Sequence, residues 1–366
     1  MPKNWMRHFE MLLTDDNGAG IVLSDFKIKF EIEWTNTMWP RVATIKVYNL
    51  SRNTNNRILG SEFSKIRMIA GYDGIASPVN ESQVGKIRNI DASKIGQTEG
   101  QNFGVIFNGD IRFTVTGRDN PTDTYILIQA IDGHRAFTNA IVNTTVAAGY
   151  TAADLHAVAM KSFNAFGVTQ GITSEFPSTV FPRGRALLMS TRDLMKNISE
   201  QCNATWQIVD NQVQMVSNNK YIHEAVVLNS DTGLIGMPQQ TMGAGVNVRC
   251  LINPNIRVCG LIELDQSSVY RATLSGDQIA GKQSVPGKTY ETEAKGNLDV
   301  VGIGGEQPAS INADGLYIVA AINYRGDTRG QEWYMDLMCL AKGGTSKLSS
   351  AALSIADPEA VAAAAK

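Results

Sequence analysis

Alternation between apolar and charged residues is the clearest pattern in this chain, and residues 25–34 show it best. The apolar positions of that stretch are Phe26, Ile28, Phe30, Ile32 and Trp34, and the charged positions between them are Lys27, Lys29, Glu31 and Glu33. Successive side chains of a β-strand point to opposite faces of its sheet. This period of two therefore predicts a strand with one buried and one solvated face.

Four further stretches near the N-terminus carry strand patterns separated by turn residues: 42–50, 63–72, 104–116 and 124–132. Short strands at such intervals are typical of an antiparallel barrel or sandwich. The polar segment between Tyr72 and Gly104 predicts a long hairpin excursion or surface loop. Residues 1–137 are therefore expected to form one antiparallel β domain.

The pattern changes to helical spacing near residue 150. Thr151 and Asp154 form a capping pair ahead of apolar residues at helical intervals, which predicts a helix of about 14 residues. A second helix is predicted to begin at Ser190, and residues 205–217 predict a β-hairpin. Residues 138–217 are expected to form a small α+β domain.

Strand patterns return in the last part of the chain. Residues 246–252 alternate, and Asn253-Pro254-Asn255 then turns the chain into the apolar stretch 256–264, which predicts two strands joined by an Asn-Pro turn. The remaining expected divisions are a second β-barrel domain at 218–264 plus 315–345, an inserted and mostly β excursion at 265–314, and an Ala-rich C-terminal tail at 346–366.

Composition indicates a folded, soluble chain. Its 366 residues carry a formal net charge of −2, with 19% charged and 43% hydrophobic residues. Disordered chains combine low hydrophobicity with a large charge imbalance, and general polyanion binders carry a basic excess. The N-terminus lacks the apolar run of a signal peptide, and no window approaches a transmembrane length, so we expect synthesis and assembly in a cytoplasm without membrane insertion.

The sequence predicts no catalytic, cofactor-binding or metal-binding residues. His8, His134, His156 and His223 lack metal-site spacing, and no P-loop or G-x-S-x-G motif is present. The glycine run Gly302-Ile-Gly304-Gly305 stops short of a dinucleotide fingerprint. Asp15, Asp16 and Asp231 occupy turn-like contexts, where Asp is expected for local reasons.

The cysteines are expected to be buried thiols: Cys202, Cys250, Cys259 and Cys339. Cys250 and Cys259 are close enough in sequence to approach one another, and their state stays open. Met38 and Trp39 lie at an expected hairpin tip, where an exposed Trp favours a partner interface.

The stretch from Asn229 to Leu264 resembles the central hub protein of bacteriophage tail baseplates. So does the later order of residues 315–319, 326–330 and 333–337, and residues 1–137 are similar to the first domain of phage hub and tail-tip proteins. In that family, 326–330 forms a tight turn, and Gly326 and Gly330 would suit positive φ there. The resemblance implies a mainly β fold, α+β overall, with two tail-tube-like antiparallel β-barrel domains, the small α+β domain between them and the mostly β insertion.

The resemblance also implies a structural function without catalysis. The expected assembly is a homotrimer whose six similar barrels form a ring that joins a threefold central spike to a sixfold tail tube. This hub would form part of the DNA ejection channel in the virion. The implied partners are the central spike protein, tail tube or tube-initiating ring proteins, the tape measure protein and baseplate wedge proteins, with DNA only in transit.

Two alternatives remain open at this point. One is the hub of a related non-contractile tail tip or contractile injection system, and the other is a tail-associated peptidoglycan hydrolase. The mixed-charge face of Lys27, Lys29, Glu31 and Glu33 suits either a channel lining or a subunit contact. The slight net acidity agrees with passage of DNA without affinity.

Overall fold

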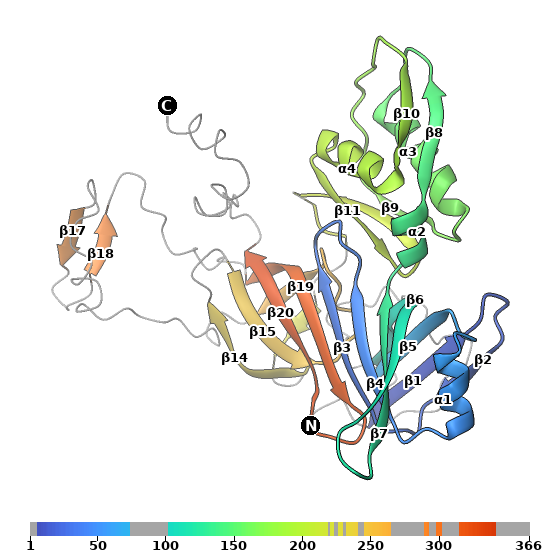
Figure 1. Cartoon of the computed structure of the whole chain (residues 1–366). Helices are drawn as coiled ribbons and strands as arrows, with labels where there is room; N and C mark the ends of the chain where they lie inside the picture. The colour runs from blue at the N-terminus through green and yellow to red at the C-terminus, as the bar shows by residue number, and fades with distance from the viewer. Residues whose placement is uncertain are drawn as a thin grey trace.

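The computed structural model describes residues 6–73, 102–218, 220–222, 226–229, 232–240, 245–264, 289–292, 298–301 and 315–341. Within those residues, 13 strands form one large sheet (Figure 1). Its strands follow the order β14, β15, β20, β19, β3, β4, β7, β6, β5, β1 and β2, and β16 pairs with both β19 and β13. Their bounds are β1 Arg7–Thr14, β2 Gly20–Leu23, β3 Ile28–Thr35, β4 Val42–Tyr48, β5 Lys65–Tyr72, β6 Asn102–Arg118, β7 Thr124–Ile131, β13 Val226–Leu228, β14 Leu234–Gln240, β15 Gly245–Leu251, β16 Leu261–Leu264, β19 Leu316–Asp327 and β20 Trp333–Ala341.

The alternation predicted for residues 25–34 is present from Ile28 on, in β3, but Phe26, predicted on the buried face, lies before the strand and is 36% exposed. Ile28, Phe30, Ile32 and Trp34 are buried, while the residues between them are half-buried or exposed. The other four predicted strands of this region correspond to β4, β5, β6 and β7, and they pair antiparallel with their neighbours. The mainly β, antiparallel class predicted from the sequence is confirmed.

The predicted pair of closed barrels is wrong. β3, from the first strand region, pairs with β19, from the last, over Lys29–Thr35 and Ala321–Asp327. We call this pairing the β3·β19 seam, and it joins both regions in one sheet. In the part of the chain that is described, that sheet is not closed into a barrel. Alternation specifies which face of a strand is buried but not which strand it pairs with, so it could not distinguish an open sheet from a barrel.

Two halves of this sheet repeat one pattern of pairing. In the first half the chain order is β3, β4, β5, β6, β7, and the pairs are β3·β4, β4·β7, β7·β6 and β6·β5. In the second half the chain order is β14, β15, β16, β19, β20, and the pairs are β14·β15, β15·β20, β20·β19 and β19·β16. All of these pairs are antiparallel, so the second half duplicates the first, displaced by four strands along the sheet.

Equivalent positions of the two halves also make equivalent contacts. Aligning the two pairing patterns sets Lys46 against Arg249 and Tyr125 against Tyr334. The Nζ of Lys46 lies 4.4 Å from the centroid of the Tyr125 ring, and the Cζ of Arg249 lies 4.3 Å from that of Tyr334. A β-bulge interrupts β6·β7 and β19·β20 at corresponding places. The repetition therefore reaches the level of individual side chains.

The two halves share one hydrophobic core. A single cluster of buried side chains includes Met11, Ile45 and Ile128 together with Val248 and Cys339. Since these residues come from β1, β4, β7, β15 and β20, neither half has a core of its own.

Residues 134–217 pack around a second cluster of buried residues, which includes Leu155, Phe163, Ile198 and Trp206. Their elements are α2 His134–Asn139, β8 Ile141–Val146, α3 Ala152–Asn164, β9 Thr169–Thr173, β10 Arg185–Ser190, α4 Thr191–Gln201, β11 Ala204–Val209 and β12 Gln212–Ser217. Both predicted helices and the predicted hairpin β11·β12 are confirmed. The predicted N-caps are also present, because Thr151 forms a full capping box and the Ser190 hydroxyl accepts a bond from the backbone of Asp193.

Several elements were not predicted. The sequence pattern did not indicate β1, β2 or α1 (Arg52–Leu59). In α1 only Ile58 is buried, and most of the other residues of the helix are polar. The short helix α2, which begins at His134, was also not predicted. The predicted strand at 256–264 is limited to β16, which pairs with β13 and β19 and not with β15. The apolar residues before it, including Ile256 and Val258, are buried without belonging to a strand, which explains the error.

Some predictions fall on residues that are not described. The predicted excursion at 265–314 is represented by β17 Thr289–Thr292 and β18 Leu298–Val301, which pair antiparallel. Outside the described residues lie the polar segment 74–101, the tail 346–366, the run 302–305, Asp231 and His223.

The expectation of positive φ at Gly326 and Gly330 is wrong, because neither residue has it. Gly326 lies in β19 directly opposite Phe30, and a Cβ there would lie 2.3 Å from two atoms of the Phe30 ring. That ring also packs on Phe9 at 5.4 Å and on Trp333 at 5.6 Å between ring centroids. Glycine is required at this position of the seam for close approach, not for backbone conformation.

We predict that Gly326→Ala destabilises the protein by about 1–3 kcal/mol, since the added methyl overpacks the seam. Urea denaturation of the variant and the wild type measures the loss. Phe30→Leu should relieve part of that loss when both changes are combined. The same loss in both backgrounds would contradict the assignment to the Phe30 ring.

Candidate functional site

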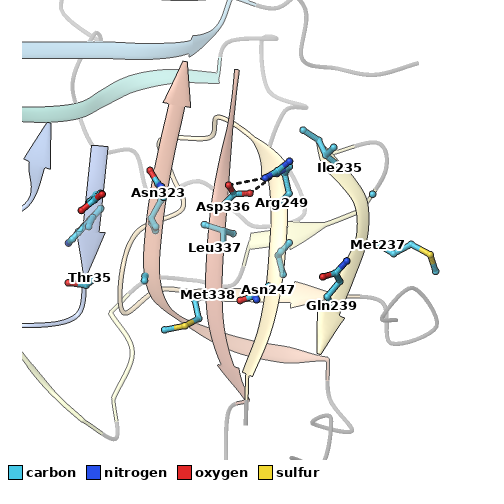
Figure 2. Close-up of a pocket in the computed structure, with 16 residues that line it drawn as sticks. Thr35, Ile235, Met237, Gln239, Asn247, Arg249, Asn323, Asp336, Leu337 and Met338 are labelled. Carbon is cyan, nitrogen blue, oxygen red and sulfur yellow. Dashed lines mark hydrogen bonds and ion pairs between the residues drawn. The ribbon is translucent and has the colours of Figure 1, made fainter. Parts of the chain in front are cut away.

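The solvated face of the sheet, opposite the shared core, is the main candidate for contact with other molecules. It contains a groove of about 760 Å³ that crosses β14, β15, β20, β19 and β3 (Figure 2). Amide and hydroxyl groups of Thr35, Asn247 and Asn323 line the groove, as do the apolar side chains of Ile235 and Met338. Its lining is therefore mixed in character rather than the mostly apolar wall of a typical small-molecule pocket.

One ion pair stands in this groove. Arg249 on β15 lies directly opposite Asp336 on β20, and its Nε and Nη2 donate to the two carboxylate oxygens at 2.6 and 3.1 Å (Figure 2). Hydrogen bonding to Asp336 raises the pKa of Arg249 above its ordinary value. Because both oxygens of Asp336 accept from the Arg249 guanidinium, the charge of this carboxylate is neutralised. Asp336 is therefore a poor candidate for acid-base chemistry.

Charges along the seam are paired in the same way. The Nε of Arg325 lies 3.1 Å from Oε1 of Glu31, and Nζ of Lys29 lies 3.4 Å from Oδ2 of Asp327. Asn323 also donates to Glu31 at 3.0 Å. The mixed-charge face predicted from the sequence therefore carries cations and anions in contact at Lys29 and Glu31, while Nζ of Lys27 lies 4.7 Å from the centroid of the Tyr48 ring.

A buried cluster of four charges joins three parts of the chain. It consists of Arg41 before β4, Asp132 after β7, Asp210 in the turn of the β11·β12 hairpin and Arg257 between β15 and β16. Arg41 Nε lies 2.9 Å from Asp132 Oδ2, Arg41 Nη2 lies 2.6 Å from Asp210 Oδ1, and Arg257 Nη1 lies 3.1 Å from Asp210 Oδ2. The cluster therefore ties the hairpin of residues 134–217 to both halves of the sheet.

The cluster satisfies most of its own polar atoms. Asp132 also accepts from the backbone N–H groups of Asp210 and Asn211 at 2.8 and 3.3 Å, and Arg41 donates to the Ile106 carbonyl at 3.2 Å. Burial raises the pKa of Asp132 to about 6, against the opposing attraction of Arg41. Burial also opposes ionisation of Asp210, but Arg41 and Arg257 outweigh it and lower the pKa of Asp210. Two cations and two anions balance, which identifies a structural clamp.

No pattern in the sequence indicated this clamp. The four residues are spread from position 41 to position 257, and no local spacing connects them. Only the folded arrangement brings their charges together.

The described histidines do not converge on one site. The Nδ1 of His8 lies 2.6 Å from Asp73 Oδ1, and its ring stacks on Phe103 at 3.9 Å between centroids. His156 lies in α3, where burial lowers its pKa, and His134 begins α2. Among the described residues, no group of three or more His, Cys, Asp or Glu side chains could hold a metal ion.

Cys250, Cys259 and Cys339 are buried free thiols, while Cys202 is partly exposed. No helix in the described ranges has the length and apolar character needed to cross a membrane.

Trp39 lies at the hairpin tip between β3 and β4 and is 63% exposed. Its ring lies 5.8 Å from that of Phe137. The exposure expected of Trp39 is confirmed, and Met38 packs at the edge of the second cluster of buried residues.

A family model described as baseplate hub gp41 matches residues 9–279. This match spans the whole first half of the sheet, part of the second, and more than half of the chain. The chain belongs to the baseplate hub gp41 family. The resemblance stated from the sequence is confirmed, and a structural role in a phage tail follows for this hub protein. No protein with a curated description matches the sequence.

One solved tail-protein structure shares the fold of this hub protein at very low identity, and a second resembles it more weakly. The tail protein from Neisseria meningitidis MC58 has 6% identity and a TM-score of 0.51, with 93% of this chain and 98% of that chain covered. The 43 kDa tail protein of prophage MuSo2 from Shewanella oneidensis has 8% identity and a TM-score of 0.49, with 92% and 98% covered.

We predict that Asp210→Ala destabilises the hub protein by about 3–5 kcal/mol, because it leaves Arg257 buried without its partner and removes one partner of Arg41. Chemical denaturation measures the change. Glu62→Ala, which breaks the exposed Arg57–Glu62 pair, is the matched control and should change stability little. Equal effects of the two substitutions would contradict the clamp.

A second prediction concerns His156. Because the pKa of His156 is lowered from 6.5 in the folded state, the unfolded chain binds a proton that the folded chain excludes. Its contribution to stability is therefore present above pH 6.5 and is lost as the pH falls below that value. The unfolding free energy of the wild type should fall relative to that of His156→Gln between neutral and mildly acid pH. A constant difference between the two proteins would refute this.

Proposed function

We propose that this chain forms the threefold hub ring of a phage tail baseplate, joining the central spike to the sixfold tail tube. The observation that supports the proposal most is the duplicated strand pattern. Because each chain has two equivalent halves, three copies supply six similar sheet segments. Such a ring presents threefold symmetry to a spike and approximate sixfold symmetry to a tube.

The solvated face is the part of the sheet suited to line a channel. Its pairs Arg249–Asp336, Arg325–Glu31 and Lys29–Asp327 neutralise one another. Duplex DNA is held by cations that are free to replace condensed counterions. A face whose cations are already paired allows DNA to pass without retention.

The proposed partners are the spike protein, tail tube or tube-initiating ring proteins, the tape measure protein and baseplate wedge proteins. The exposed Trp39 suits a contact with one of them, since a large aromatic side chain in solvent commonly anchors an interface. The proposal assigns no catalytic step to the chain, and assembly is proposed to occur in the host cytoplasm. A contractile tail is the proposed setting, with a related tail tip or injection machine as the alternative.

Electron microscopy of the purified protein tests the ring. We expect threefold particles with a central hole, six density lobes around it, and a mass of three chains in analytical ultracentrifugation. A chain that stays monomeric at high concentration would sink the proposal. Release of soluble fragments from purified cell walls would favour the tail-associated hydrolase instead.

DNA binding tests the channel lining. Replacing Glu31, Glu33 and Asp336 together by Lys frees Arg325 and Arg249 and adds three more cations. We expect the affinity for duplex DNA to rise by about tenfold or more and to fall steeply with salt. A control with the same charge change elsewhere replaces Glu62, Glu175 and Glu200 by Lys. Equal gains in both proteins would show that net charge alone, and not this face, governs DNA affinity.

A further inference from the structure

Several strand edges of the sheet have no partner among the described residues, including those of β2 and β13, and two of the others belong to the duplicated pattern. The first is the outer edge of β14, which pairs with β15 alone. The second is the later part of β6: its residues 102–110 pair with β5, while residues 112–118 pair only with β7. We call residues 112–118 the free edge of β6. An unpaired edge presents backbone N–H and C=O groups that can pair with another chain.

The duplication shows what the free edge of β6 corresponds to. In the second half, β19 is the counterpart of β6, and its first residues pair with β16 as those of β6 pair with β5. The later residues of β19 pair with β3 across the seam. Because β14 is the counterpart of β3, the matching partner for the free edge of β6 is a β14 strand. The β14 strand of the same chain lies at the opposite end of this run of strands (Figure 1).

We propose that the free edge of β6 in one copy lies against β14 of the next copy, so that the contact between copies repeats the β3·β19 seam within each copy. This proposal rests on the hub ring proposed above and specifies how its subunits meet. The contact is heterologous, since two different edges meet, and such contacts close into rings when the rotation allows.

Side-chain exposure at the two edges supports a covered surface. Phe113 and Val115 on the free edge are 41% and 50% exposed, and Ile235 and Met237 on β14 are 37% and 61% exposed. Thr116 is also exposed, although its counterpart in β19, Tyr324, is 2% exposed against the core. At Thr116 the free edge therefore leaves open a position that the equivalent seam buries inside the chain.

The equivalence also predicts the register. Within the chain, Gly326 pairs with Phe30, and the counterpart of Gly326 is Arg118. The counterpart of Phe30 is the bulged segment around Met237, where β14 shifts its register against β15. Arg118 of one copy should therefore lie beside Met237 of the next. The bulge and Pro238, which has no backbone N–H, interrupt the β14 edge at this point, so backbone pairing with the free edge of β6 is expected on either side of it.

Disulfide trapping tests the contact. The protein carries Arg118→Cys and Met237→Cys in a Cys202→Ser background, so that the partly exposed native thiol is removed. Mild oxidation should link copies into covalent dimers and trimers. The mismatched pair Arg118→Cys with Asn247→Cys, one strand further into the sheet, should give no linked species. Links from the mismatched pair, or none from the matched pair, would overturn the register.

A charge placed in the contact provides the second measurement. Thr116→Lys places an unpaired cation at the position whose seam counterpart, Tyr324, is buried against the core, and should raise the dissociation constant of the trimer by about 100-fold or more. Thr44→Lys, on the solvated face in the interior of the sheet, should leave it unchanged. A ring that tolerates Thr116→Lys and resists trapping would reject this contact while leaving the hub ring standing. A wild-type chain that forms no ring would reject both.

Discussion

The antiparallel pairing of β3 with β19 is the interaction on which this architecture depends. It brings Glu31 and Arg325 together although 294 residues separate them in sequence. Without it the two halves of the sheet would each have an uncovered edge, and their shared core would lose its continuity. The close approach of Phe30 to Gly326 and the ion pairs on the solvated face are both consequences of this register.

The buried clamp complements the seam. Backbone pairing fixes the two halves side by side, but it does not position residues 134–217 against them. Arg41, Asp132, Asp210 and Arg257 do so, because two charges of each sign must meet in a single arrangement to offset the cost of leaving water. Trp34 adds a neutral bond to the same junction, donating through Nε1 to Gln207 at 2.8 Å.

Local features of the fold could be predicted from the sequence, and pairing could not. The alternation in β3 and the capping box at Thr151 each depend on residues a few positions apart, so both can be recognised in the sequence. The seam, the shared core and the clamp depend on contacts between distant residues, and no local pattern encodes them. The polar helix α1 was missed because its single buried side chain, Ile58, leaves no apolar periodicity.

The length of chain between β3 and β19 has a consequence for biosynthesis. The ribosome releases β3 long before β19, so the nascent polypeptide carries an unpaired strand edge through most of its translation. Contacts of such sequence separation form slowly, because the intervening loop must lose its entropy first. The newly made N-terminal half is therefore prone to pair with wrong strands. Shielding its strand edge until translation ends would favour correct folding.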